Sequence, residues 1–324
     1  MPLLEVHDLT VEYHTDEGRF RAVEDLSFSL EPKKTLGIVG ESGCGKTTAM
    51  LALLRLLPEM GRIVGGQVLF DSVDLLRLST AEIARYRWSR ISIIFQGAMN
   101  ALNPVRTVGS QIAEAILLHE VVPPNEAKQE VFRLLDLVGI TEQRASQYPH
   151  QYSGGMRQRA MIAMALACHP QVVIADEPST ALDVMIQAQI MDLLQKIQKE
   201  LGLSIIVVTH DLGLVAELCD DVLVMYGGRM AEVGSTEDIY NHAQHPYTRR
   251  LLEAFPDIEN PRAELASIPG YPPPLNNLPP GCRFQPRCLV AQDICSLKTP
   301  PTLSVGSGHR VGCVRAEEME SRSA

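Results

Sequence analysis

Residues 40–47 read Gly-Glu-Ser-Gly-Cys-Gly-Lys-Thr, an octapeptide that fits the pattern G-x-x-x-x-G-K-[ST]. It follows an apolar run over Thr35–Val39 that predicts a buried strand, and it opens a predicted helix over Thr47–Leu57. In this setting the glycines let successive backbone N–H groups and the positive end of the helix surround a triphosphate. Lys46 supplies a charge to the β and γ phosphates, and the Thr47 hydroxyl is placed to bind Mg²⁺. The octapeptide therefore predicts a site for ATP and Mg²⁺.

A pair of carboxylates ends another predicted strand. Val172–Ala175 is apolar throughout, and Asp176 and Glu177 follow it directly. An Asp-Glu pair at a strand end is by itself often a solvated turn, but here it accompanies a phosphate loop. From their positions, we expect Asp176 to hold Mg²⁺ directly or through water, and Glu177 to accept a proton from the attacking water.

Residues 4–255 alternate short β-type runs with helical patterns, which predicts an α/β domain with a largely parallel sheet. A helix is expected over Val184–Leu201, because Gly202 follows it, and Pro58 is expected to stop the helix that begins at Thr47. The clearest strands are short and nearly all apolar, as for strands buried on both faces. They are Thr35–Val39, Val172–Ala175, Ser204–Thr209 and Val222–Met225.

Two parts of the chain depart from this rhythm. Helical spacing over Val108–Leu118 and Ala127–Val138, without a convincing strand, predicts a helical insertion at about residues 100–160. After Phe255 the many prolines exclude long helices and central strands. We therefore expect a nucleotide-binding domain at residues 1–255 and a Cys- and Pro-rich extension at residues 256–324.

Charge and hydropathy limit the classes of function. The chain has 29 Lys and Arg against 39 Asp and Glu, a net charge of -10, which gives little electrostatic support for binding nucleic acid. Its longest apolar runs are much shorter than the roughly 20 residues that a membrane helix needs. The first residues carry no basic segment followed by an apolar one, so no export signal is expected. The sequence predicts a protein that stays in the cytosol.

Residues 152–159, Tyr-Ser-Gly-Gly-Met-Arg-Gln-Arg, resemble the signature sequence of ABC ATPases. A serine and two glycines at the start of a helix form a second anion site, although an isolated S-G-G is usually only a helix cap. The resemblance implies a P-loop NTPase cassette with a RecA-like core, an N-terminal antiparallel β subdomain and a helical subdomain. It also implies a second ABC ATPase subunit, because in this family Ser153 and Gly155 would bind the γ phosphate of ATP held by the partner.

Further family positions are occupied. Gln96 resembles the glutamine that touches Mg²⁺ and lines the joint with the membrane subunits, and His210 resembles the switch histidine that contacts the γ phosphate. Residues 179–183, Ser-Thr-Ala-Leu-Asp, resemble the loop between two cassettes, and Tyr13 resembles the aromatic residue that stacks on adenine, although Thr15–Phe20 lengthens its spacing. The resemblance implies Glu177, His210 and Lys46 as catalytic and Thr47, Gln96 and Asp176 as Mg²⁺ ligands. It implies nucleotide contacts at Tyr13, Gly40, Ser42, Gly43, Gly45, Lys46, Thr47, Thr48, Gln96, Ser153, Gly154, Gly155 and Asp183.

Three segments resemble one branch of the family, the peptide and nickel importers. They are residues 95–104 (FQGAMNALNP), residues 245–248 (HPYT) and residues 281–288 (GCRFQPRC). The resemblance implies an ATP-hydrolysing motor for uptake of di- and oligopeptides, peripheral on the cytoplasmic face of the inner membrane. The implied partners are a related ATPase subunit, two transmembrane permease subunits and an extracytoplasmic binding protein. Nickel, glutathione and oligosaccharides stay open as cargo, because ATPase subunits do not contact the cargo.

Four cysteines lie in the extension with the spacing C-x5-C-x6-C-x17-C: Cys282, Cys288, Cys295 and Cys313. In a cytosolic chain metal explains such a set better than disulfides. The importer resemblance points to a [4Fe-4S] cluster, while structural Zn²⁺ and buried thiols without metal stay open. No metal role is expected for Cys44, Cys168 and Cys219, and the Cys44 thiol is expected to be open to alkylation without preventing phosphate binding.

Two other classes of function compete with the importer motor. One is a soluble ABC ATPase of DNA repair or translation, which the acidic charge and the lack of a second cassette or coiled coil disfavour. The other treats the extension as the main feature, an iron-sulfur sensing module with the cassette as its switch. Co-purification with membrane subunits, nucleic acid or neither discriminates between the three.

Overall fold

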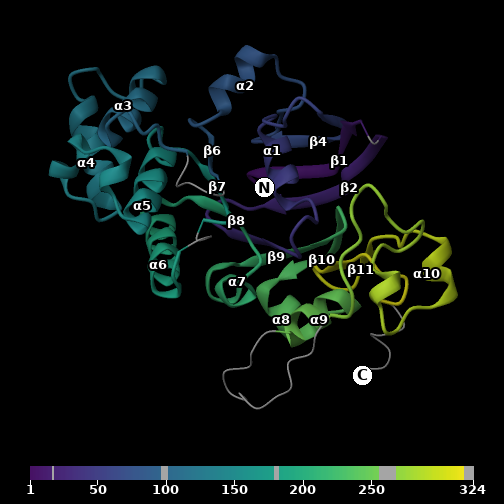
Figure 1. Cartoon of the computed structure of the whole chain (residues 1–324). Helices are drawn as coiled ribbons and strands as arrows, with labels where there is room; N and C mark the ends of the chain where they lie inside the picture. Colours follow the sequence, from purple (N-terminus) through teal and green to yellow (C-terminus); the bar gives the residue numbers. More distant parts are fainter. Residues whose placement is uncertain (17, 96–100, 179–181, 255–267, 317–324) are drawn as a thin grey trace. The chain divides into compact units, whose positions relative to one another are not determined.

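The computed structural model describes residues 1–16, 18–95, 101–178, 182–254 and 268–316 (Figure 1). The chain divides into two compact units. The first comprises Met1–Leu30, Thr35–Leu76 and Thr209–Ala324, and the second comprises Glu31–Lys34 and Arg77–Val208. Within the described ranges, every helix is too short or too polar to span a bilayer.

The first unit begins with an antiparallel sheet in the strand order β2-β1-β4-β5. Its strands are β1 (Leu4–Thr15), β2 (Gly18–Leu30), β4 (Gly61–Phe70) and β5 (Val73–Asp74). The register between β1 and β2 shifts along the pair, as expected where β-bulges interrupt a ladder. This sheet confirms the expected N-terminal antiparallel subdomain.

A second group of strands in the first unit carries the phosphate loop. Strand β3 (Thr35–Val39), buried at all five residues, pairs in parallel with β9 (Asp221–Tyr226), and β9 pairs antiparallel with β10 (Arg229–Ser235). The link between β9 and β10 is two glycines with φ of 54° and 85°, as a tight hairpin of primed type requires. The extension adds β12 (Arg310–Val311) to β10 and β11 (Leu303–Ser304) to β12.

The helices of the first unit are short, and one ends earlier than predicted. Helix α1 runs over Lys46–Leu53, not to Leu57, because Arg55 adopts a left-handed φ of 52° before Pro58 is reached. The others are α7 (Leu212–Leu218), α8 (Thr236–His242), α9 (Pro246–Glu253), the single turn Gln285–Arg287 and α10 (Asp293–Leu297). In Figure 1 the yellow extension with α10 lies beside β10, and its elements are all short, as its prolines predict.

The second unit contains a parallel sheet and the helical insertion. Strands β6 (Ile91–Ile94), β7 (Val172–Asp176) and β8 (Ser204–Thr209) pair in the order β8-β7-β6, and β7 and β8 are buried throughout. The described part of residues 100–152 holds no strand, so the helical insertion is confirmed. The helices of the second unit are α2 (Thr80–Tyr86), α3 (Val108–Leu118), α4 (Ala127–Leu137), the short turns Glu142–Ser146 and Pro149–Gln151, α5 (Gly154–Ala165) and α6 (Val184–Leu201).

Candidate nucleotide-binding site

The octapeptide forms a tight loop between β3 and α1, and two of its glycines are required by close backbone contacts. Gly40 has a φ of 150°, and a Cβ there would lie 2.2 Å from the Met225 carbonyl oxygen. Gly45 has a φ of 102°, and its Cβ would lie 2.4 Å from the Ala22 carbonyl oxygen. No larger residue fits at either position, so the loop is pressed against β9 and β2 and its N–H groups are held in place.

Lys46 is folded over the loop rather than extended into solvent. Its side chain is buried, and Nζ donates hydrogen bonds to the carbonyl oxygens of Gly40 at 2.6 Å and Glu41 at 3.1 Å. Gly45 is the N-cap of α1 and contributes no side-chain cap, so the first N–H groups of the helix receive no acceptor from that residue. The positive end of α1 and the Lys46 ammonium together favour an anion.

The structure corrects the expectation for Cys44. Its thiol is 4% exposed, and Sγ lies 3.8 Å from Lys46 Nζ, inside the loop. Burial raises the pKa of Cys44, which lowers the fraction of reactive thiolate. Alkylation of Cys44 therefore requires the loop to open.

An aromatic pair lies beside the start of α1. The rings of Tyr13 and Phe20 stack with centroids 5.7 Å apart, and the Tyr13 hydroxyl is 3.4 Å from Thr48 Oγ1. Tyr13 and Phe20 face each other in the β1/β2 register. No role for Phe20 was predicted from the sequence. Its aromatic side chain, a few residues after Tyr13 on the second strand of a hairpin, could have indicated one.

The predicted Mg²⁺ ligand Asp176 and the predicted base Glu177 lie at the end of β7 in the second unit. Asp176 is the last residue of the strand and is 1% exposed. Glu177 has a left-handed φ of 44°, and its N–H donates to the Val208 carbonyl oxygen at 2.8 Å. This conformation costs a residue other than glycine about 1–3 kcal/mol, and such strain concentrates at functional sites. With this φ, Glu177 leaves the extended conformation of β7.

The signature segment begins α5 of the same unit. Ser153 is exposed and is the N-cap, with its Oγ accepting from the Met156 N–H at 3.3 Å. Gly154 follows it as the first helical residue. A Cβ at Gly155 would lie 2.9 Å from Ile186 Cγ2 on α6, so the glycine permits close packing of the two helices. Asp183 is likewise the exposed N-cap of α6 and accepts from the Ile186 N–H at 3.0 Å.

The predicted site residues divide between the two units. Tyr13 and the loop from Gly40 to Thr48 belong to the first unit, and so does His210, which is exposed directly after β8. Asp176, Glu177, Ser153, Gly154, Gly155 and Asp183 belong to the second. Gln96 and residues 179–181 lie outside the described residues.

The four cysteines of the extension are free thiols, and they influence one another electrostatically. Burial, together with the nearby Cys313, Cys295 and Cys288, raises the pKa of Cys282 to about 11. The sulfurs of Cys282, Cys288 and Cys313 are hydrogen-bonded by the backbone of Phe284, Val290 and Arg315, each two residues further on. Among the residues that the structure describes, no three His, Cys, Asp or Glu side chains are arranged to hold a metal ion.

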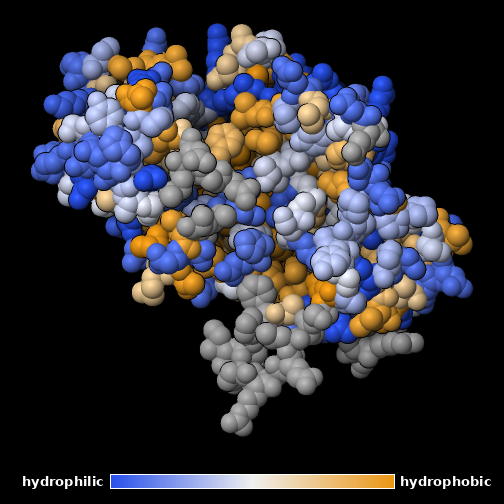
Figure 2. All heavy atoms as spheres, viewed as in Figure 1, coloured by the Kyte–Doolittle hydropathy of each residue, from blue (hydrophilic) through white to orange (hydrophobic). Residues whose placement is uncertain are grey.

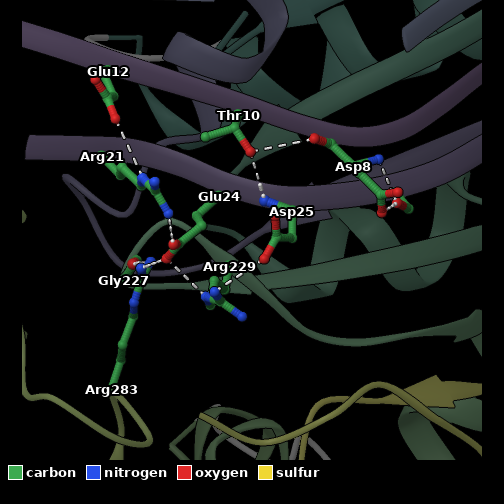
Figure 3. A network of polar contacts seen from close by, with 10 residues as sticks. Asp8, Thr10, Glu12, Arg21, Glu24, Asp25, Gly227, Arg229 and Arg283 are labelled. Atoms are coloured by element: carbon green, nitrogen blue, oxygen red, sulfur yellow. Dashed lines mark hydrogen bonds and ion pairs between the residues drawn. The ribbon is translucent and has the colours of Figure 1, made fainter. Parts of the chain in front are cut away.

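Ion pairs join the extension to β2 (Figure 3). Glu24 accepts hydrogen bonds from Arg283 of the extension, from Arg229 at 3.0 Å and from Arg21. Burial alone would raise the pKa of Glu24, but the hydrogen bonds from Arg229 and Arg21 and the charge of Arg283 lower it to about 2. Burial lowers the pKa of Arg283 to about 10, so both partners are charged at neutral pH.

Known proteins resemble this chain along nearly its whole length. Residues 23–180 match the family described as ABC transporter, and residues 231–295 match the one described as oligopeptide/dipeptide transporter, C-terminal region. The oligopeptide transport ATP-binding protein OppD of Salmonella typhimurium is 48% identical over 318 residues, covering 98% of this chain and 94% of that protein. The dipeptide transport ATP-binding protein DppD of Bacillus subtilis is 47% identical over 314 residues, covering 96% and 94%.

Solved structures share the cassette fold. One is the dimeric structure of an ATP-binding cassette in a post-hydrolysis state with ADP and Pi, which is 26% identical with a TM-score of 0.64 and covers 72% of this chain and 98% of that one. Another is cbiO1 from Clostridium perfringens, part of an ABC transporter complex, at 31% identity and a TM-score of 0.65, covering 74% of this chain and 91% of that one. These matches confirm the predicted cassette fold.

Proposed function

Because the chain belongs to the ABC transporter ATP-binding proteins of the oligopeptide and dipeptide type, we propose that it is the ATP-hydrolysing motor subunit of a bacterial peptide importer. The observation that carries this proposal is the 46–48% identity to peptide transport ATP-binding proteins, which extends through the C-terminal region. The relatives named for peptides favour di- and oligopeptides over nickel, glutathione or oligosaccharides as cargo.

The loop residues bind the phosphates of ATP. The N–H groups from Gly43 to Thr48 and the ammonium of Lys46 contact the β and γ phosphates, as the buried lysine and the open helix end support. Tyr13, stacked on Phe20 near Thr48, takes the adenine. The exposed Ser42 contacts the nucleotide from the tip of the loop.

The reaction is attack of water on the γ phosphorus with departure of ADP. Glu177 accepts the proton of this water as the new P–O bond forms and the bond to ADP breaks, and His210 contacts the γ phosphate. Thr47, Gln96 and Asp176 would hold Mg²⁺, and their oxygen donors suit that ion. When bound, Mg²⁺ neutralises charge on the phosphates. The left-handed turn at Glu177 is the structural support for its role as base.

A second cassette completes the site in this proposal. Ser153, Gly154, Gly155 and Asp183 contact nucleotide held by a related ATPase subunit. Support comes from the exposed caps Ser153 and Asp183, and from Val184 and Met185, which start α6 with 78% and 72% of their surface exposed. Figure 2 shows hydrophobic side chains at the surface of α6, a feature typical of a surface that meets another chain.

The membrane partners follow from the same family. We place the chain on the cytoplasmic face of the inner membrane, bound to two transmembrane permease subunits that receive substrate from an extracytoplasmic binding protein. The helical insertion and the segment around Gln96 form the joint with these subunits. Closure of the two cassettes over ATP then moves the permease subunits.

A [4Fe-4S] cluster held by Cys282, Cys288, Cys295 and Cys313 belongs to the proposal as well. Four soft sulfur donors between residues 282 and 313 suit it. Burial raises the pKa of Cys282, Cys288 and Cys313, whereas a backbone hydrogen bond to each of these sulfurs favours the thiolate that a cluster needs. The cluster, when bound, would staple a segment whose prolines prevent long helices. Anaerobically purified protein is expected to absorb near about 400 nm with roughly four irons per chain. Stoichiometric zinc, or four metal-free thiols, would contradict it.

Co-expression tests the importer assignment. The chain is expected to co-purify in detergent with two transmembrane permease subunits and to support ATP-dependent peptide uptake in proteoliposomes with the binding protein. Co-purification with nucleic acid, or purification alone with full ATPase activity and no uptake, would contradict the assignment. Lys46→Ala is expected to abolish uptake. Lys196→Ala, on the exposed face of α6, is the matched control and is expected to leave uptake unchanged.

A further inference from the structure

Glu41, the second residue of the phosphate loop, is held by residues from the last third of the chain. The Arg287 guanidinium donates from Nη1 to Glu41 Oε2 at 2.6 Å and from Nη2 to Glu41 Oε1 at 2.9 Å. The Glu41 N–H donates to the Tyr247 hydroxyl oxygen at 3.0 Å. All three residues belong to the first unit. A two-point Arg-carboxylate fork fixes orientation as well as distance.

The position of Arg287 is fixed independently of Glu41. The residue is 7% exposed, and its Nε donates to the Pro269 carbonyl oxygen at 2.8 Å. Its Nη1 also reaches the Tyr226 hydroxyl at 3.2 Å, and the guanidinium lies 5.8 Å from the Tyr226 ring centroid. The Arg287 side chain is therefore already ordered by these contacts. Its ion pair with Glu41 does not carry the entropy cost of ordering two long side chains that a surface ion pair carries.

Glu41 links Arg287 to Lys46, the lysine that is proposed to bind the phosphates. Lys46 Nζ donates to the backbone carbonyl of Glu41, the same residue whose side chain Arg287 holds. The Glu41 carboxylate also adds a negative charge to a loop that must accept a triphosphate. The positive charge of Arg287, within hydrogen-bond distance of the Glu41 carboxylate, offsets most of the repulsion between this carboxylate and a bound triphosphate.

We propose that Arg287 is a positioning residue for the phosphate loop, which neutralises Glu41 and fixes the loop in the shape that receives ATP. The inference rests on the proposed nucleotide site and adds to it a dependence on the extension. Arg287 acts through Glu41 and is not placed in contact with ATP. Without Arg287, the Glu41 carboxylate loses its two-point partner, and the Glu41 carbonyl that accepts from Lys46 is less firmly held.

Four variants of the full chain test this, by titration with a fluorescent ATP analogue. Arg287→Met is expected to raise the Kd at least about tenfold, because it leaves a partly buried carboxylate unpaired. Glu41→Gln removes the repulsive charge but keeps one acceptor oxygen for Arg287, and is expected to change the Kd much less than Arg287→Met does. The double variant Glu41→Gln with Arg287→Met is expected to recover most of the affinity that Arg287→Met loses, and Arg287→Lys, a charge without the fork, is expected to fall between.

Arg283→Met is the matched control, because it weakens the docking of the extension without removing the contact to Glu41. Arg283 also anchors the extension, through Glu24 and the Gly227 carbonyl, but it does not touch Glu41. This variant is expected to lower stability while its Kd for the ATP analogue stays near that of the unchanged chain. Equal weakening by Arg283→Met and Arg287→Met would overturn the proposal, since docking of the extension would then explain both.

Two further outcomes would overturn the positioning role. They are an unchanged Kd in Arg287→Met, and a double variant as weak as Arg287→Met alone. Lys46→Ala in the same titration reports on the nucleotide site itself. Unchanged binding in Lys46→Ala would contradict the proposed function, whereas failure of the Arg287 variants alone would contradict only the inference.

Discussion

Glu24 and Arg283 form an ion pair between residues 259 positions apart in the sequence, and this pair joins β2 of the N-terminal sheet to the Cys-rich extension. Arg283 directly follows Cys282, just as Arg287 directly precedes Cys288. Each arginine reaches out of the cysteine region to a carboxylate elsewhere in the same unit, Glu24 in one case and Glu41 in the other. These two ion pairs help to hold the extension, in addition to the pairing of β12 with β10.

The Glu24 pair makes stability depend on pH. The folded-state pKa of Glu24, about 2, lies below its ordinary value of 4.5, so its contribution is complete above about pH 4.5 and is lost as pH falls towards 2. Glu24→Gln is expected to lower the free energy of unfolding by about 2 kcal/mol at pH 7. Denaturant unfolding at pH 7 and pH 3 measures the free energy of unfolding of the unchanged chain and of Glu24→Gln. The difference between these two free energies is expected to be smaller at pH 3 than at pH 7.

Glu217→Gln, at an exposed carboxylate of α7, is the control and is expected to change stability little at either pH. An equal loss of stability for Glu24→Gln at pH 7 and pH 3 would show that the charge of Glu24 is not what holds the extension.

The ring of Tyr13, rather than its hydroxyl, is expected to bind the nucleotide. Tyr13→Ala removes the ring that stacks on Phe20 and is expected to raise the KM for ATP about tenfold, since base–aromatic stacking contributes about 1–3 kcal/mol. Tyr13→Phe loses only the contact with Thr48 and is expected to keep the KM close to that of the unchanged chain. Steady-state kinetics compares the two. Similar KM increases in both variants would assign the effect to the hydroxyl.

The Cys44 thiol, inside the phosphate loop, is expected to react slowly with alkylating reagents in the native protein. Cys44, Cys168 and Cys219 are all buried, and burial raises the pKa of Cys168 and of Cys219 to about 12. Iodoacetamide at neutral pH, followed by mass spectrometry, is expected to label these three slowly in the native protein and fully in denaturant. Rapid native labelling of Cys44 would mean that the loop opens readily and that its buried state is not the dominant one.

The sequence predicted those features whose signals are local. Helix α6 has the predicted bounds because Asp183 caps its start and Gly202, with a φ of 64°, ends it. Strands β3 and β8 were also predicted to the residue, since buried parallel strands are continuous apolar runs. Helix α1 ends four residues before the predicted Leu57, because the left-handed Arg55 carries no sequence signal as strong as Pro58.

The contacts that surround the loop were not predictable in the same way. Arg287 and Glu41 lie 246 residues apart, and Tyr247 and Glu41 lie 206 apart. The segments at residues 245–248 and 281–288 were noticed only as marks of the family branch, because their partners become visible only once the chain is folded. The domain boundary at residue 255 and the roles of the site residues stay predictions.

The central claim is that ATP is held between two cassettes, with the phosphate loop on one and the signature serine on the other. The direct measurement is a structure of the assembly in which Glu177→Gln blocks hydrolysis and ATP is bound. Glu177→Gln is expected to retain ATP and to cut turnover at least about 10²-fold, the low end of what a positioned base contributes. The account predicts Ser153 within hydrogen-bond distance of the γ phosphate of the ATP bound to the partner cassette, and Ser153 facing bulk water in that assembly would contradict it.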